Sequence, residues 1–345
     1  MGFEEFDPNG VGVKGSLFGL PYTLDEAEII VIPVPWDVTV SYGAGTSFAP
    51  EAILEASSQV DFESPDYSEA WKVKVAMAEI PEVWLSLGQE LRANSEQYID
   101  WLESGSDPVL KEEMESILSE INEESAQLMN YVEQETQYWR EQGKLTILLG
   151  GDHSTPLGHI TSIGKLNSGM GILQIDAHAD LREAYEGFQY SHASIMRNAL
   201  KNPEVSKLIQ VGIRDYCEEE VEYVQESKGR VVSFYDQRIK EEQYNGKTWS
   251  ELCDEIVQVL PNEFYLSFDI DGLDPKLCPN TGTPVPGGFE LEEVFYLLKK
   301  AIESGKKLVG ADLNEVSPGE DEWDANVGAR ALFRMIQFLY KSHQS

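Results

Sequence analysis

The sequence predicts an α/β protein whose mainly parallel central sheet is covered by helices on both faces. Short apolar runs that fit buried strands alternate with helical segments over the second half of the chain. The runs are 145–149, 171–175, 208–213, 230–234, 264–268 and 307–311. Runs that are apolar throughout are typical of parallel strands, which are buried on both sides. No internal repeat or low-complexity linker divides the chain, so we expect one domain over residues 1–345.

The N-terminal half adds two strands and one long helix to this prediction. A strand is expected over Glu28–Ile32 and should be stopped by Pro33 and Pro35, because proline cannot continue a central ladder. A second strand is expected over 74–80. Apolar residues at helical spacing then predict a long amphipathic helix at about 109–142. Residues 81–108 show no clear pattern.

The composition limits the partners of the protein. The 61 acidic and 26 basic residues give a net charge of -35, which disfavours binding to a nucleic-acid backbone. A solvated acidic surface is the simple explanation, although such a field also attracts cationic substrates. No apolar run approaches the roughly 18 residues of a membrane span, and the acidic N-terminus does not resemble a secretory signal. With three widely spaced cysteines, we expect a cytoplasmic protein that does not bind membranes.

Metal-binding residue types gather in five short segments, each of which follows a predicted strand. They are 150–154 (GGDHS), 176–180 (DAHAD), 191–194 (SHAS), 269–275 (DIDGLDP) and 314–318 (NEVSP). Three of the five histidines of the chain lie in these segments. Because ligands bind outside the carboxyl ends of the strands in open α/β sheets, the segments predict a metal centre at that edge.

The spacing within three of the segments favours convergence of the side chains. In an extended backbone, residues i, i+2 and i+4 project to one side, so DAHAD can direct three ligands at one point. Taken alone, the DAHAD array fits a metal site and a surface loop about equally well. The pair Asp269 and Asp271, taken alone, fits a solvated loop, because Asp pairs are common in an acidic protein. Their shared position after apolar strands favours the metal site. The candidate ligands are His153, Asp176, His178, Asp180, Asp269 and Asp271.

The number and type of ligands indicate the kind of metal. A catalytic zinc ion keeps about three protein ligands, so six candidates are too many for one tetrahedral site. Carboxylate and imidazole donors without sulfur suit a pair of Mn²⁺ ions. Such a pair activates a water molecule as a nucleophile near neutral pH.

The segments GGDHS, DAHAD, SFDIDGLDP and NEVSP resemble those of the ureohydrolase superfamily, which includes arginase, agmatinase, guanidinobutyrase and formimidoylglutamase. The resemblance extends from about Glu28 to the C-terminus. It implies an arginase-like three-layer α/β/α sandwich with two Mn²⁺ ions per subunit, Ni²⁺ being possible. It also implies a homo-oligomer, either a trimer or a hexamer.

The resemblance also implies a role for each candidate residue. The first ion would be held by His153, Asp176, Asp180 and Asp269, and the second by Asp176, His178, Asp269 and Asp271. His192 matches the histidine that relays protons, and Glu315 the carboxylate that binds the guanidinium group. Asp180 can also accept a hydrogen bond from the attacking nucleophile. His159 and His343 match no motif and are expected to be structural or exposed.

The implied reaction is hydrolysis of a guanidine-type C–N bond with release of urea, and agmatine is the favoured substrate. Residues 181–185 replace the Asn-containing stretch that arginases use to bind the amino-acid head group. Arg182 could instead bind a substrate carboxylate. The alternative substrates are guanidine, guanidinobutyrate, guanidinopropionate, arginine and formimidoylglutamate. A single-zinc amide hydrolase of the deacetylase type and a catalytically silent homologue are the alternative classes.

Overall fold

The computed structural model describes residues 6–41 and 43–344, and its centre is an eight-stranded sheet in which every strand pair is parallel. The strand order is β2-β1-β3-β8-β7-β4-β5-β6. The strands are β1 (Ile29–Val34), β2 (Val75–Met77), β3 (Leu145–Gly150), β4 (Met170–Ile175), β5 (Val205–Ile213), β6 (Val231–Tyr235), β7 (Glu263–Asp269) and β8 (Lys307–Asn314).

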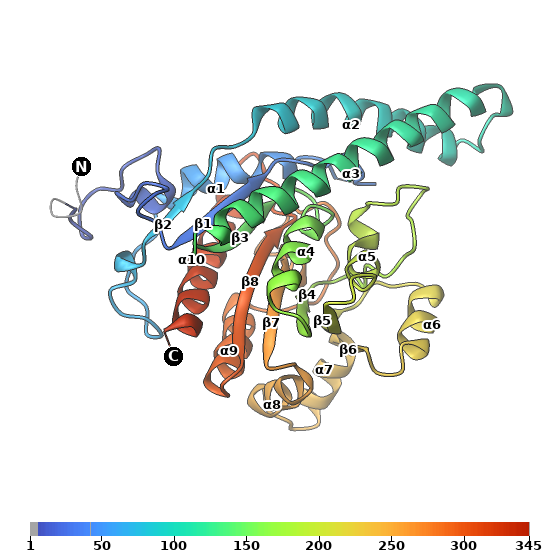
Figure 1. Cartoon of the computed structure of the whole chain (residues 1–345). Coiled ribbons are helices and arrows are strands. Elements are labelled where there is room, and N and C mark those ends of the chain that lie inside the picture. The colour runs from blue at the N-terminus through green and yellow to red at the C-terminus, as the bar shows by residue number, and fades with distance from the viewer. Residues whose placement is uncertain (1–5, 42, 345) are drawn as a thin grey trace.

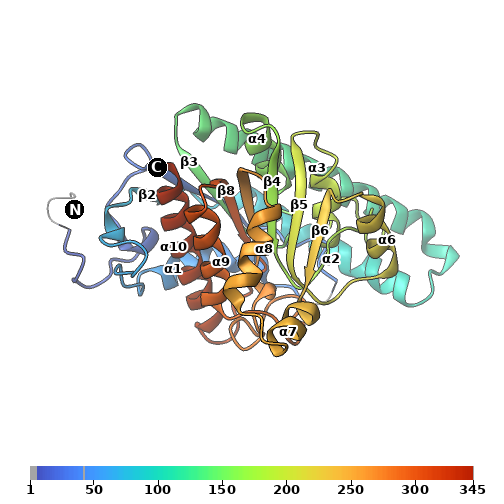
Figure 2. The same cartoon turned by 90° about the horizontal axis from the view of Figure 1, so that it is seen from below.

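Helices cover both faces of this sheet (Figures 1 and 2). The helices are α1 (Ala49–Ser57), α2 (Glu82–Glu103), α3 (Lys111–Glu141), α4 (Leu157–Leu166), α5 (Ile195–Ala199), α6 (Glu218–Glu226), α7 (Asp236–Tyr244), α8 (Trp249–Val259), α9 (Leu291–Glu303) and α10 (Trp323–His343). Apolar side chains of α1, α8, α9 and α10 form one core layer with the sheet. Those of α2 and α3, and of α4 and α5, form layers on the other face. The predicted three-layer α/β/α sandwich is confirmed.

Strand β7 shows why the sequence of a buried parallel strand is apolar at consecutive positions. Phe264, Leu266 and Phe268 pack into the core beneath α8, α9 and α10. Tyr265 points to the opposite core, beside α4 and α5. Since successive side chains of a strand alternate between the two faces and both faces are covered, almost every position must be apolar.

The expected end of β1 at Pro33 is wrong. Pro33 lies within β1 and is paired with Leu149 of β3. The other neighbour, β2, pairs with β1 only as far as Val31. The N–H of Ile29 points toward β2, so the nitrogen of Pro33, four residues further on, faces the side where β2 has already ended. Proline therefore removes no ladder hydrogen bond at this position.

Helices α2 and α3 form an antiparallel hairpin that extends beyond the rest of the molecule (Figure 1). Residues 81–108 show no clear pattern in the sequence, yet α2 occupies Glu82–Glu103. Its buried residues, among them Leu91 and Ile99, pack against α3 and the adjacent end of the sheet. The apolar stripe of α2 is narrow, since most positions of this helix face water, and the helix is therefore hard to recognise in the sequence.

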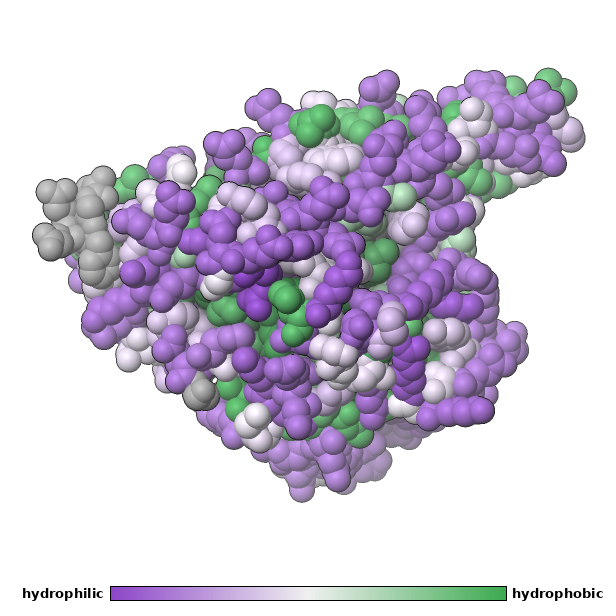
Figure 3. Space-filling model, viewed as in Figure 1, coloured by the Kyte–Doolittle hydropathy of each residue, from purple (hydrophilic) through white to green (hydrophobic). Residues whose placement is uncertain are grey.

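The surface is mainly hydrophilic on the face seen in Figure 3. Across residues 6–41 and 43–344, no helix combines the length and the apolar character that a membrane crossing demands.

Candidate active site

Four of the five sequence segments meet at the carboxyl edge of the sheet. They follow β3, β8, β7 and β4, which are consecutive neighbours in the strand order. The register aligns their ends: Leu149 pairs with Leu313, Asp269 with Asn314, and Ile175 with Phe268. Parallel strands in this register bring segments that are far apart in the sequence to one place.

The first group of ligand atoms surrounds His153. Its Nδ1 atom lies 3.0 Å from Asp176 Oδ2, 3.0 Å from Asp180 Oδ2 and 3.3 Å from Asp269 Oδ2. All four side chains are buried. This is the set that the sequence resemblance implied for the first ion.

The second group surrounds His178 and shares Asp176 with the first. His178 Nδ1 lies 2.9 Å from Asp271 Oδ2 and 3.7 Å from Asp176 Oδ1. His178 is partly exposed, with 23% of its side chain accessible, whereas Asp176 and Asp271 are buried. The candidate ligand groups are therefore adjacent, one at the base of the site and one nearer its mouth.

The buried polar atoms of these groups fit bound cations. His153 Nδ1 and Asp271 Oδ2 are both buried and have no hydrogen-bond partner in the described part of the chain. Burial raises the pKa of Asp269 well above its usual value, and the neighbouring Asp271 and Asp176 raise it further. Burial opposes protonation of His153, yet Asp176, Asp180 and Asp269 raise its pKa well above normal. Such a concentration of negative charge needs compensating positive charge, which divalent ions would supply.

Backbone contacts lock the ligand segments together. The N–H of Ala177 donates to Asp271 Oδ1 at 3.0 Å, and the N–H of Asp271 donates to Asp269 Oδ1 at 2.9 Å. Arg214 adds a clamp: its Nη2 atom donates to the carbonyl of Asp271 at 2.6 Å and to two further loop carbonyls. These bonds hold the loop after β7 against the loop after β4 and against Arg214, which follows β5.

Glu315 lies directly beside the first ligand group. Its Oε1 atom accepts the backbone N–H of His153 at 2.8 Å, and its own N–H donates to the carbonyl of Gly151 at 2.9 Å. Glu315 has a φ of 62°, a left-handed conformation that is costly for a residue with a side chain. Burial raises the pKa of Glu315 well above its usual value, and the nearby Asp152 raises it further. A buried, strained carboxylate of this kind suits the binding of a cationic group.

The expectation that all five segments follow strands is wrong for residues 191–194. His192 begins a short 3₁₀ turn, His192–Ser194, that leads into α5, after a long irregular connection from β4. Its side chain nevertheless lines a cavity of about 140 Å³ together with His178 and Asp180. Burial and then the charge of His178 lower the pKa of His192 to about 3, so the imidazole is neutral near pH 7.

The outer wall of the same cavity carries groups of both charges. Asp215 has a largely exposed carboxylate, 3.9 Å from His178 Nε2. Arg182 rests over the ring of Tyr185, 4.9 Å from its centroid. Ser41 and further residues complete the wall. These side chains form the wall of the cavity beside His178 and His192.

Several residues that support the site were not among the predicted site residues. Ser267 is 2.9 Å from His153 Nε2 and donates to Asp312 Oδ1 at 3.0 Å. The available signal was polarity: both residues interrupt otherwise apolar strands, and Arg214 directly follows β5. His159 and His343, which matched no motif, lie outside the ligand groups. His159 is buried between Tyr265 and Thr146, and His343 lies 3.0 Å from the carbonyl of Leu308.

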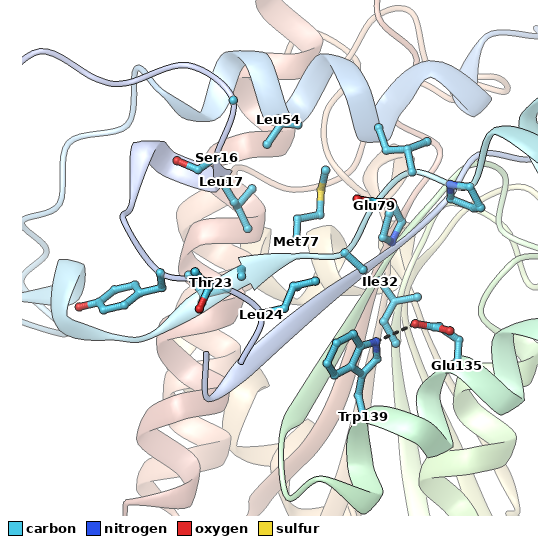
Figure 4. A pocket seen from close by; sticks show the side chains of 18 of the residues that line it. Ser16, Leu17, Thr23, Leu24, Ile32, Leu54, Met77, Glu79, Glu135 and Trp139 are labelled. Carbon is cyan, nitrogen blue, oxygen red and sulfur yellow. Dashed lines mark hydrogen bonds between the residues drawn. The ribbon is translucent and has the colours of Figure 1, made fainter. Parts of the chain in front are cut away.

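A larger cavity, of about 1000 Å³, lies at the β2 edge of the sheet and contains none of these residues. It is bounded by the N-terminal segment, β1, β2 and α3 (Figure 4). Apolar side chains such as Leu54, Met77 and Trp139 line it, and Glu135 accepts the indole N–H of Trp139 at 2.8 Å. The volume of a cavity therefore does not identify the active site. The candidate ligand residues identify it.

The fold and the site together define an arginase-like α/β/α hydrolase. The sequence model of the arginase family matches residues 27–337. An N(1)-aminopropylagmatine ureohydrolase of Thermus thermophilus is 32% identical over 320 residues, which are 92% of this chain and 91% of the relative. An agmatinase of Bacillus subtilis is 28% identical over 90% of this chain and 92% of its own.

Solved structures agree on the fold. The agmatine ureohydrolase of Thermoplasma volcanium superposes with a TM-score of 0.70 at 22% identity, covering 95% of each chain. The proclavaminate amidino hydrolase of Streptomyces clavuligerus gives a TM-score of 0.70 at 19% identity, covering 97% of this chain and 100% of the other. The chain belongs to the arginase family and is a ureohydrolase, a hydrolase of guanidino C–N bonds.

Proposed function

We propose that the protein hydrolyses a guanidine with a cationic tail, and that agmatine, cleaved to putrescine and urea, is the favoured substrate. The observation that carries this proposal is the position of Glu315, a buried carboxylate bonded to the main chain of His153 in the first ligand group. A cationic guanidinium held there would lie beside both ligand groups.

Two divalent ions would be held by the ligand groups, and we favour Mn²⁺ over Ni²⁺ because the donors are carboxylates and imidazoles without sulfur. The first ion would take His153, Asp176, Asp180 and Asp269, and the second Asp176, His178, Asp269 and Asp271. When bound, such ions lower the pKa of a water molecule and polarise the substrate.

The protein side chains would divide the remaining work. Glu315 would accept N–H groups of the guanidinium in charge-assisted hydrogen bonds and so fix the orientation of the trigonal carbon. Asp180 would accept a hydrogen bond from the attacking water. His192, neutral near pH 7, can accept a proton from this water and deliver it to the leaving amine as the C–N bond breaks.

A cationic tail is favoured by the charge around the mouth of the cavity. Asp215 offers an exposed carboxylate there, and the net charge of -35 attracts cations to the protein. The named relatives point the same way, because agmatine and N(1)-aminopropylagmatine both carry an amine at the end opposite the guanidine. Agmatine and its aminopropyl derivative are therefore the first substrates to test.

A guanidino acid is the second candidate, and one observation favours it. Arg182 lines the same cavity and could pair with a substrate carboxylate. A guanidinobutyrase of Pseudomonas aeruginosa is 27% identical over 92% of this chain. In the first candidate, by contrast, Arg182 only packs on Tyr185.

Urea release by the purified, Mn²⁺-loaded protein tests these proposals. We expect kcat/KM to be highest for agmatine or aminopropylagmatine and at least about tenfold lower for guanidinobutyrate, a difference of about 1.4 kcal/mol. Arginine, guanidinopropionate, guanidine and formimidoylglutamate complete the panel. D215N should lower kcat/KM for the amines, and R182M should lower it only for the acids. A preference for guanidinobutyrate that R182M abolishes would establish the second candidate instead.

We further infer that residues 1–345 act as a single catalytic domain, a view supported by the one continuous sheet. We expect this domain to assemble as a homo-oligomer. One zinc ion per chain in a metal analysis would favour a deacetylase-type hydrolase. Full Mn²⁺ loading without urea release from any substrate of the panel would favour a catalytically silent homologue.

A further inference from the structure

A row of polar side chains crosses the buried interior on the α4 side of the sheet, beyond the ligand groups. Its members are His153, Ser267, Asp312, Tyr265, His159 and Thr146, and each is at most 1% exposed. Ser267 and Asp312 are directly paired positions of β7 and β8. Burying polar groups costs free energy unless each finds a partner, so a continuous row of them in an apolar interior requires an explanation.

The inner half of the row determines which nitrogen of His153 carries a proton. The hydroxyl of Ser267 donates to Asp312 Oδ1 at 3.0 Å, and His153 Nε2 lies 2.9 Å from the same hydroxyl oxygen. Because the hydroxyl proton is directed to Asp312, the oxygen can only accept from His153. Nε2 therefore carries a proton in both the neutral and the charged ring, so Nδ1 is the atom whose lone pair an ion can take.

That lone pair faces the first ligand group. Nδ1 is the atom of His153 that lies 3.0 Å from carboxylate oxygens of both Asp176 and Asp180. It has no hydrogen-bond partner among the described residues. The arrangement of Ser267 and Asp312 thus directs Nδ1 of the imidazole to the place where an ion would bind.

The outer half of the row supports Asp312 from the other side. Asp312 Oδ2 is buried and has no hydrogen-bond partner among the described residues, although the Tyr265 hydroxyl lies near this carboxylate. His159 Nδ1 lies 2.6 Å from the Tyr265 oxygen, and His159 Nε2 lies 2.9 Å from the Thr146 hydroxyl. If Tyr265 donates to Asp312, then His159 donates to Tyr265 and Thr146 donates to His159. Every donor of this arm then points toward Asp312.

We propose that Asp312 is a positioning residue for the buried metal ion: it accepts the hydroxyl of Ser267, and through Ser267 it holds His153 in the Nε2–H form with Nδ1 directed at the ligand group. Tyr265 and His159 hold Asp312 in turn. This inference rests on the two-ion centre proposed above and extends it to residues that touch neither ion nor substrate.

The test is the Mn²⁺ affinity of the full-length, metal-free D312N variant, measured by competition with a chelating indicator. Asparagine keeps the shape of the side chain but removes the charged acceptor. We expect the affinity of one of the two ions to fall about 10- to 100-fold, while the other changes little. The same loss should appear for the single remaining ion in a D271N background, which would assign it to the site of His153.

Removal of one hydroxyl from the outer arm provides a second test. Y265F keeps the ring and should weaken the same ion by a smaller factor, about 3- to 10-fold. T136V is the matched control, since the Thr136 hydroxyl is also buried but bonds only to the carbonyl of Val132 in α3. It should leave both affinities unchanged. If D312N does not fold, Y265F decides alone.

Two results would overturn the positioning role. One is unchanged affinity for both ions in D312N, or in Y265F where D312N does not fold. The other is equal weakening of both ions with a lowered melting temperature of the metal-free variant, which a general structural role would produce. A wild-type protein that binds fewer than two ions would instead count against the proposed function.

Discussion

The backbone N–H of His153 donates a 2.8 Å hydrogen bond to Oε1 of Glu315, across 162 positions of the sequence. The ring of His153 faces the first ligand group, while its main chain holds the carboxylate proposed to bind the substrate. One residue therefore sets the distance between these two parts of the site. Both parts sit on adjacent strand ends, since β3 and β8 are neighbours in the sheet.

The E315Q variant separates the charge of Glu315 from its structural bond. Glutamine can still accept the N–H of His153, but it cannot form charge-assisted bonds with a guanidinium group. We expect kcat/KM for urea release to fall by about 10- to 100-fold, which corresponds to roughly 1.4–2.7 kcal/mol. Metal analysis should still give the wild-type content. E315A, which also frees the amide of His153, should disturb both properties. Wild-type kcat/KM in E315Q would exclude Glu315 as the guanidinium ligand.

The H192N variant tests the proton relay. His192 lines the cavity but belongs to neither ligand group, so the variant should keep both ions. Loss of a general acid–base group typically costs about 10²- to 10⁴-fold in turnover. We expect kcat to fall into that range with a small change in KM, and added imidazole to restore part of the activity. Unchanged kcat, or a lost ion, would show that the assignment is wrong.

The positions of the ligand residues could be predicted because parallel sheets obey a simple rule. Segments after buried strands must meet at one edge, and the predicted ligands His153, Asp176 and Asp269 do converge there. The position of His192 could not be predicted from this rule, since His192 lies in an irregular connection whose path depends on contacts far away in the sequence. No local pattern specifies where such a loop returns to the site.

Other features depended on partners that a sequence does not reveal. Pro33 fits inside β1 only because the neighbouring strand β2 is short. The role of the polar residues Ser267 and Asp312 depends on their pairing across two strands, which the sequence does not reveal. In each case the local preference was clear, but the tertiary neighbour decided the outcome.

Removal of metal should lower the stability of the fold. Ions that bind only the folded chain stabilise it by about 2.7 kcal/mol per site at a free concentration 100 times the Kd. We expect a chelator to lower the melting temperature by several degrees and Mn²⁺ to restore it. The D271N variant, which should retain one ion, ought to show a smaller metal-dependent shift. A melting temperature that does not respond to chelation would contradict a preformed two-ion centre.

His159 should make the metal-free protein sensitive to acid. Burial lowers the pKa of His159 to about 3, against about 6.5 in an unfolded chain. Between these values the unfolded state binds one more proton than the folded state at this site, so the contribution to stability falls as the pH falls. One proton corresponds to about 1.4 kcal/mol per pH unit.

The H159Q variant measures this contribution, because glutamine does not titrate. We expect the free energy of unfolding, from urea denaturation of the metal-free proteins, to depend less steeply on pH in H159Q than in the wild type below pH 6. The difference in slope should approach about 1.4 kcal/mol per pH unit. H343Q is the comparison: burial also lowers the pKa of His343, but this side chain is only partly buried and should contribute less. Equal slopes in the wild type and H159Q would mean that His159 accepts a proton in the folded state.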